Sequence, residues 1–146
     1  MRVVPDTNVI VSALIWGGMP YRLLEAAVAD DIELYTSPDL MTELRNLLAR
    51  RHLAARFAQQ RSSVEQAVRF YEELAIAVSP LATPAAVPRD ADDDHVVAAA
   101  LAANSEVLVS GDRDLLSLGS YEGLRIVTVA KALEMIMADR EPTRTP

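Results

Sequence analysis

Short apolar runs alternate along the chain with longer stretches in which apolar residues recur at helical spacing. Five of the short runs predict strands, at Val3-Val4, 32–35, Ala77-Val78, 107–109 and Ile126-Val127. Helical patterns predict helices at 21–29, 53–60, 64–74 and 130–137, and an Ala-rich helix that starts at Asp92–Asp94 and ends near Asn104. The long apolar stretch from Val9 to Trp16 is followed by Gly17 and Gly18, and its pattern predicts no particular element.

One further helix carries its own start signal. Ser37 favours an N-cap and Pro38 favours the first turn of a helix. One apolar stripe follows, made of Leu40, Leu44, Leu47 and Leu48. Because strands that are apolar on both faces alternate with helices, the sequence predicts an α/β fold whose parallel sheet is covered by helices on both sides.

A single domain accounts for the 146 residues, since domains cluster at roughly 100–150 residues. We expect it to span residues 1–138, with a flexible tail at 139–146, and we expect a loop at 81–89, which contains Pro84 and Pro88. The absence of cysteine excludes disulfide scaffolds, thiol catalysis and cysteine-bound zinc. No apolar run is long enough to cross a membrane, and Asp6 interrupts any signal-peptide core, so we expect a cytoplasmic protein.

The net charge of −7 argues at first against a nucleic-acid partner. The charge is unevenly distributed, because the segment from Arg45 to Arg69 holds six arginines and one glutamate. If the seven acids that form groups or stand in apolar surroundings shared one metal site, the rest of the protein would be neutral; they are Asp6, Glu43, Asp92, Asp93, Asp94, Asp112 and Asp114. A phosphate-bearing substrate therefore stays possible, although the arginines equally fit a solvated helix face.

The acids follow the predicted strands. Asp6 comes directly after the first strand, and Asp112 and Asp114 come directly after the strand at 107–109. Ligands of parallel sheets bind outside the carboxyl ends of the strands, where these side chains are expected. Each acid also has a structural explanation, because Asp6 fits a turn or N-cap, Glu43 fits a helix surface, and Asp112 and Asp114 fit caps.

Taken together, the acids predict one site for a divalent cation. Several neighbouring carboxylates cannot all ionise without a counter-charge, and Mg²⁺ and Mn²⁺ prefer oxygen ligands. Histidine does not suggest zinc, since His52 and His95 are the only two and His95 fits a surface position. The chemistry that such a site indicates is hydrolysis of a phosphodiester.

Four short motifs resemble those of PIN-domain ribonucleases, and they occur in the order and spacing of that family. The branch that they resemble most contains toxins of toxin–antitoxin pairs (the VapC-like branch). The likeness runs from Val3 to about Leu133. The motifs are PDTNV (5–9), SPDLMTEL (37–44), RDADDD (89–94) and VSGDRDLL (109–116).

The resemblance implies an α/β/α sandwich around a mostly parallel sheet of about five strands, and Mg²⁺- or Mn²⁺-dependent cleavage of single-stranded RNA. It assigns the four main catalytic and metal-binding acids to Asp6, Glu43, Asp93 and Asp112. Asp94 and Asp114 are secondary metal candidates, and Asp92 is a weaker choice than Asp93 for the third acid. Thr7, Asn8 and Ser110 would orient the carboxylates or metal-bound water.

The resemblance also implies partners. It implies a homodimer or a dimer of dimers, and a cognate antitoxin that fills the groove. Trp16, Met19, Tyr21 and Phe57 are candidates for exposed apolar contacts, although Trp16 and Phe57 also fit core packing. The candidate RNA-binding arginines are Arg45, Arg50, Arg51 and Arg113, and the candidates for base stacking include Tyr21, Tyr35 and Tyr71.

Two other classes of function stay open. A metal-dependent phosphatase or phospho-acceptor protein would usually carry a second Asp two residues after Asp6, where this chain has Asn8, and a Lys near the phosphate, whereas Lys131 is the only lysine. A catalytically inactive module that binds RNA or protein would use the acids for structure or for a basic partner. Such a module should tolerate Asp6→Ala and Asp112→Ala without a change in partner binding.

Overall fold

The computed structural model describes residues 1–80 and 91–140, and at residues 51 and 91–93 it describes the backbone alone. The strands in these segments are β1 (Arg2–Pro5), β2 (Glu33–Thr36), β3 (Ile76–Ala77), β4 (Val107–Val109), β5 (Ser120–Tyr121) and β6 (Leu124–Val127). The helices are α1 (Thr7–Trp16), α2 (Gly18–Val28), α3 (Pro38–Leu48), α4 (Arg51–Gln59), α5 (Val64–Leu74), α6 (Ala91–Ala102), α7 (Arg113–Leu118) and α8 (Val129–Arg140).

The strands form one sheet in the order β3-β2-β1-β4-β6-β5. All neighbours pair in parallel except β5, which pairs antiparallel with β6 at the edge. The predicted α/β/α fold with a mostly parallel sheet is therefore confirmed. The additional strand is β5, which returns to β6 through Glu122 and Gly123, both with positive φ, as a two-residue hairpin turn requires.

Helices cover both faces of the sheet because successive strand residues point to opposite sides. In β1, Val3 belongs to the hydrophobic cluster formed with α1, α2, α3, α5 and α8. The next residue, Val4, belongs to the cluster formed with α6 and α7. Leu108 shares the cluster of Val4, while its neighbours Val107 and Val109 share that of Val3. The central strands are thus apolar on both faces, as their sequence predicts.

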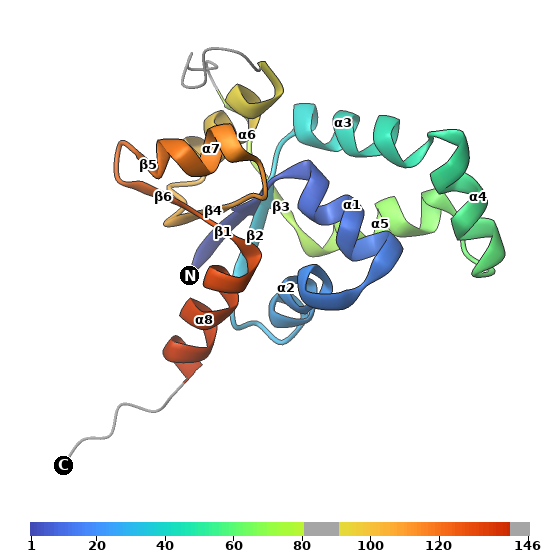
Figure 1. The fold of residues 1–146 in the computed structure, drawn as a ribbon, viewed down its shortest axis with the longest axis horizontal. Coiled ribbons are helices and arrows are strands. Elements are labelled where there is room, and N and C mark those ends of the chain that lie inside the picture. Colours follow the sequence, from blue (N-terminus) through green and yellow to red (C-terminus); the bar gives the residue numbers. More distant parts are fainter. Residues whose placement is uncertain (81–90, 141–146) are drawn as a thin grey trace.

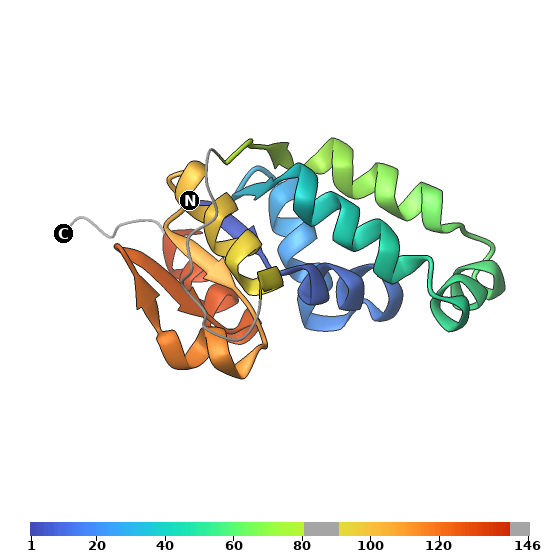
Figure 2. The same cartoon turned by 90° about the horizontal axis from the view of Figure 1, so that it is seen from above.

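Helices α3, α4 and α5 extend to one side of the sheet, as both views show (Figures 1 and 2). Helix α1 packs against α3 and α4, and α3 packs against α5. Phe57 of α4 is 3% exposed and belongs to the core, so its prediction as an exposed contact is wrong. Tyr35 and Tyr71 are also buried, and burial raises the pKa of the Tyr71 phenol above its usual value, so neither tyrosine is open to a base.

Several boundaries differ from the sequence prediction. The apolar stretch 9–16 forms most of α1, which ends where Gly17 takes a positive φ. The predicted loop at 81–89 lies outside the described residues, as do residues 141–146 of the predicted tail. Helix α8 ends at Arg140, and the domain boundary at 138 stays a prediction. Within the described ranges, no helix has the length and apolar character that a bilayer crossing requires.

The start of α3 is built as its sequence predicts. The Ser37 hydroxyl oxygen accepts a hydrogen bond from the Leu40 N–H at 3.3 Å, and Pro38 occupies the first turn. Ser37 follows β2 directly and is buried, so this cap fixes where α3 leaves the sheet. Because Glu43 lies on α3, the cap also sets the position of one predicted acid.

Substitution of Ser37 by Ala should lower the free energy of unfolding by about 1 kcal/mol, because the Leu40 N–H loses its acceptor at a buried helix end. Urea unfolding followed by circular dichroism measures the change. Ser117→Ala is the matched control, because Ser117 is an exposed helical serine. Equal stability of the two variants would contradict the assigned role of the cap.

Candidate active site at the carboxyl ends of β1 and β4

The pairing of β1 with β4 brings two predicted site residues together. In this parallel pair Pro5 lies opposite Val109, so Asp6 and Ser110 leave the sheet side by side. The Asp6 N–H donates to the Val109 carbonyl at 2.8 Å, and the Ser110 N–H donates to the Val127 carbonyl at 3.0 Å. The two residues are therefore held by continuation of the sheet hydrogen bonds beyond the strand ends.

The Ser110 hydroxyl connects the two strand-end acids. It donates to Oδ2 of Asp6 at 2.8 Å and accepts from the Asp112 N–H at 3.0 Å. Ser110 is completely buried and Asp6 is 7% exposed. A hydroxyl has one proton to donate, so the bond to Asp6 fixes the orientation of the Ser110 hydroxyl and leaves its lone pairs to accept from the Asp112 N–H.

Asp6 occupies the N-cap position of α1, but its side chain does not cap the helix. Asp112, in contrast, is a true cap. Its Oδ1 accepts from the N–H groups of Asp114 and Leu115 at 2.8 and 3.2 Å, at the start of α7. The structural explanation as a helix cap thus accounts for one carboxylate oxygen of Asp112, and it does not account for the side chain of Asp6.

A hollow of about 430 Å³ lies beside these acids. We call it the Asp6 hollow. Its walls come from the first turn of α1, the start of α2, the loop after β4 and the start of α8. Its lining residues are Asp6, Asn8, Val9, Ser12, Pro20, Gly111, Asp112 and Val129. Two of the four predicted acids and the predicted orienting residue Asn8 therefore share one cavity.

The hydroxyl of Thr7 is a further polar group at this edge. Thr7 is buried in the first turn of α1, and within the described chain its Oγ1 has no hydrogen-bond partner. A buried hydroxyl without a partner costs free energy, so such a group calls for a physical explanation. A water or ligand bound at the edge of the sheet would supply the missing partner.

Glu43 lies in a separate hollow of about 390 Å³, between α3 and α6. We call it the Glu43 hollow, and it is lined by Asp39, Thr42, Glu43, Asn46, Leu47, Arg50 and His95. His95 is partly exposed, and its Nδ1 lies 3.4 Å from Oδ2 of Asp39, which joins the first turns of α6 and α3. Among the described residues, Asp6 and Asp112 therefore line the Asp6 hollow, and Glu43 lines the Glu43 hollow.

The first turn of α6, with Asp92, Asp93 and Asp94, lies at the same edge of the sheet. The other end of α6 is anchored at the start of β1, where the Ala103 carbonyl accepts from the Arg2 guanidinium at 3.0 Å. Helix α6 therefore runs antiparallel to β1, and Asp94 is partly exposed near its start. The side chains of Asp92 and Asp93 lie outside the described residues.

The described side chains include no group of three or more His, Asp or Glu placed to hold a metal ion. The predicted third ligand, Asp93, is not among these side chains. Mg²⁺ is commonly bound by one or two carboxylates, with waters and substrate phosphates completing its shell. The oxygens of Asp6 and Asp112 in one hollow fit that requirement in ligand type and number.

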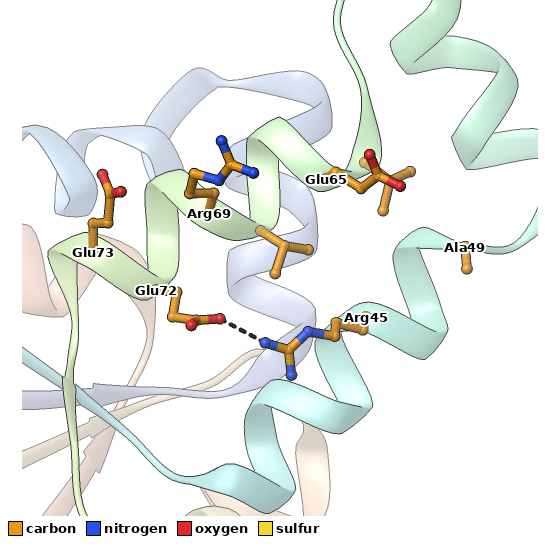
Figure 3. Close-up of a pocket in the computed structure, with 8 residues that line it drawn as sticks. Arg45, Ala49, Glu65, Arg69, Glu72 and Glu73 are labelled. Carbon is orange, nitrogen blue, oxygen red and sulfur yellow. Dashed lines mark hydrogen bonds and ion pairs between the residues drawn. The ribbon is translucent and has the colours of Figure 1, made fainter.

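The candidate RNA-binding arginines separate into different surroundings. Arg50 lines the Glu43 hollow, and Arg113 is exposed next to Asp112. Arg45 instead pairs with Glu72 at 2.5 Å, in a third hollow of about 530 Å³ between α3 and α5 (Figure 3). Arg51 begins α4, and its side chain lies outside the described residues.

Ser12 and Asn46 line the two hollows and are not among the site residues that the sequence predicts. Ser12 follows Asn8 by four residues on α1, and Asn46 follows Glu43 by three residues on α3, so both lie on the helix face of a predicted site residue. The sequence does contain the signal for Asn46, because it predicts the helix that carries both Glu43 and Asn46. The signal for Ser12 required α1, whose apolar sequence predicts no element.

Substitution of Ser110 by Ala should lower the free energy of unfolding by about 1–3 kcal/mol, because the Asp112 N–H loses its acceptor and the Asp6 carboxylate loses a donor in a buried place. Urea unfolding measures this loss. Ser12→Ala is the control, since Ser12 lines the same hollow and makes no side-chain hydrogen bond within the described chain. A Ser110→Ala variant as stable as the control would contradict the assigned role of the hydroxyl.

Comparison with known proteins agrees with this geometry. A PIN-domain family model matches residues 2–114. An uncharacterized protein of Methanocaldococcus jannaschii, MJ1680, is 29% identical over 119 residues, which cover 81% of this chain and 75% of that protein. PIN domains are typically nucleases, and they generally use divalent metal ions. The family match covers both strand-end acids and most of the described sheet, and the chain belongs to the PIN-domain family.

Proposed function

We propose that this protein is a Mg²⁺- or Mn²⁺-dependent endoribonuclease that cleaves single-stranded RNA by hydrolysis of phosphodiester bonds. The observation that carries the proposal is the shared hollow of Asp6 and Asp112, with Ser110 hydrogen-bonded to both residues. Family membership implies nuclease activity in general. The metal, the single-stranded substrate and the residue roles are inferences from the motifs and from this geometry.

The ligands in this proposal are Asp6 and Asp112, joined by Asp93 from the first turn of α6, with Asp94 and Asp114 as secondary candidates. Glu43, on α3, is the fourth catalytic and metal-binding acid of the proposal. A divalent cation at such a site supplies positive charge to phosphate oxygens and makes water a better nucleophile at neutral pH. Ser110 donates a hydrogen bond to the Asp6 carboxylate, and the positive end of the α1 dipole favours its ionised form.

The rest of the edge fits the handling of a phosphate chain. Arg50 lines the Glu43 hollow and Arg113 follows Asp112 in the chain, so Glu43 and Asp112 each have a neighbouring cation that attracts phosphate. Asn8 and Asn46 add hydrogen-bonding amides to the two hollows. In the proposal these neutral and cationic groups bind and orient the RNA, which offsets the repulsion between its phosphates and the acids.

The biological role that we propose is that of a toxin in a toxin–antitoxin pair, with a protein antitoxin and a homo-oligomer as the assemblies. This part rests on the motif resemblance. Exposed apolar side chains on two helices in contact, Val28 of α2 and Met137 of α8, supply surface of the kind that protein interfaces bury. Co-expression of the neighbouring gene product followed by size-exclusion chromatography tests the assembly.

A second candidate function is a module that binds RNA without cleaving it. One observation favours it: Asp112 already serves as a helix cap, which occupies one of its carboxylate oxygens. The two candidates differ in one outcome. The module should bind RNA equally well after substitution of Asp6, and the nuclease should lose cleavage.

Asp6→Asn should abolish metal-dependent cleavage of single-stranded RNA, with a loss of at least about 100-fold, because even residues outside the ligand set typically cost 10–100-fold. Mn²⁺ at ten times its dissociation constant should add about 1.4 kcal/mol to the stability of the wild type, a rise of roughly 3–6 °C in Tm. This rise should shrink in Asp6→Asn.

Gel-based cleavage of a labelled RNA and thermal melts with and without Mn²⁺ measure these two effects. Asp139→Asn is the control, because Asp139 is an exposed acid near the far end of α8. Full metal-dependent cleavage by Asp6→Asn would contradict the proposal. RNA binding without any cleavage by the wild type would favour the non-catalytic module.

A further inference from the structure

A stacked pair of side chains lies at the end of α1 farthest from the acids. Trp16, the last residue of α1, is 64% exposed, and the guanidinium carbon of Arg56 on α4 lies 4.1 Å from the centroid of its ring. The Nε of Arg56 is buried and has no hydrogen-bond partner within the described chain. The arginine is therefore held by the ring while one of its donors goes unused.

The exposure of Trp16 leaves a stacking surface open. The guanidinium covers one face of the indole, and a residue that is nearly two thirds accessible presents its other face to solvent. Proteins that bind single strands use such aromatic faces, often beside arginine, because every base offers a flat π surface. Tyr35 and Tyr71 are buried and Tyr21 is 38% exposed, so Trp16, at 64%, is the most exposed aromatic side chain among the described residues.

The pair is aligned with the proposed site. Asn8, Ser12 and Trp16 are spaced four residues apart, so they form one stripe along α1. Asn8 and Ser12 line the Asp6 hollow, and Pro20, which follows Trp16 in the next helix, lines it as well. At 1.5 Å per residue, the eight residues from Asn8 to Trp16 span about 12 Å. An RNA strand that follows this stripe from the acids therefore reaches the Trp16 indole.

The charge at this end of the molecule also suits RNA. Arg56 belongs to the segment 45–69 with its excess of five positive charges, whereas the acids cluster at the other end of α1. A second copy of the protein, with its net charge of −7, would gain less from this positive segment than a polyanion would. The combination of a cation, an open ring and a polar stripe that leads to the acids favours a nucleotide over an apolar protein partner.

We propose that Trp16 and Arg56 form a binding site for one unpaired base of the RNA, away from the scissile phosphate. The base stacks on the open face of the Trp16 indole. Arg56 stacks on the opposite face of the ring and attracts the neighbouring phosphate. This site rests on the proposed ribonuclease function and extends it. With this site, Trp16 determines how tightly the protein binds single-stranded RNA. It also determines the distance between the cut and the end of the RNA.

The sequence offers a direct probe, because Trp16 is the only tryptophan. Addition of a short single-stranded RNA in EDTA, where cleavage is blocked, should quench the intrinsic tryptophan fluorescence in a saturable way. The same RNA annealed to its complement, and inorganic polyphosphate, should quench far less, since neither offers an unpaired base. Quenching by polyphosphate equal to that by RNA would overturn the stacking site.

Variants separate the site from the function on which it rests. Trp16→Ala should weaken binding of labelled single-stranded RNA by roughly 5- to 150-fold, whereas Trp16→Phe should recover most of the affinity. Ile76→Ala, an exposed apolar residue on β3, is the matched control and should bind like the wild type. Circular dichroism checks that each variant is folded.

Three outcomes would overturn the inference. If the wild type binds and cleaves RNA but Trp16→Ala binds it equally well, the stacking site is wrong and the ribonuclease function stands. If the wild type neither binds nor cleaves RNA, both fail. If Trp16→Ala converts a dimer to a monomer in sedimentation and leaves RNA affinity unchanged, the indole belongs to an interface between two copies of the chain.

Discussion

The parallel pairing of β1 with β4 is the constraint on which the candidate site depends. Its register sets Pro5 opposite Val109, so that Asp6 and Ser110 leave the sheet as neighbours although 104 positions separate them. A slip of one residue would turn Val3 and Val4 toward the wrong cores and would separate the Ser110 hydroxyl from the Asp6 carboxylate. The apolar cores on both faces therefore fix the chemistry at the strand ends, because they fix the register.

The polar groups at this edge stabilise a carboxylate that the fold buries. Asp6 is almost completely buried, and a buried carboxylate is costly unless it is hydrogen-bonded or paired with a positive charge. Ser110 supplies one hydrogen bond, and the N-terminus of α1 supplies a favourable dipole. An edge arranged in this way suits an ion with oxygen ligands. The segment 45–69, which has an excess of five positive charges, lies in the helices α3–α5 that extend to one side of the sheet (Figure 1), and it gives a phosphate chain a surface to follow.

The sequence predicts the central sheet well, because Val3-Val4 and 107–109 are buried on both faces and must be continuously apolar.

The sequence predicts the structure poorly where the local pattern of residues does not reflect their environment in the fold. Helix α1 has only Asn8 and Ser12 as a short polar stripe to mark its period, since much of the helix is enclosed between the sheet, α2 and α3. The sequence does not distinguish the environment of Phe57 from that of Trp16. In the structure Phe57 of α4 packs into the core, whereas Trp16 is exposed and its ring stacks against Arg56. The short strand β5 depends on a turn at Glu122 and Gly123 that has no strong sequence signal. The motifs predict four acids in one site. In the structure Asp6 and Asp112 line one hollow and Glu43 lines another, and the side chain of Asp93 is outside the described residues, so the four-acid site stays a prediction.

The central claim is that Asp6 and Asp112 together hold a divalent cation. The most direct measurement is a structure from crystals grown with Mn²⁺, in which anomalous scattering locates the ion independently of the protein atoms. The account predicts a peak in the Asp6 hollow, at about 2.0–2.2 Å from carboxylate oxygens of Asp6 and Asp112, close to the distances that Mg²⁺ demands. A Mn²⁺-saturated crystal with no peak there, or with a peak only beside Glu43, would contradict it.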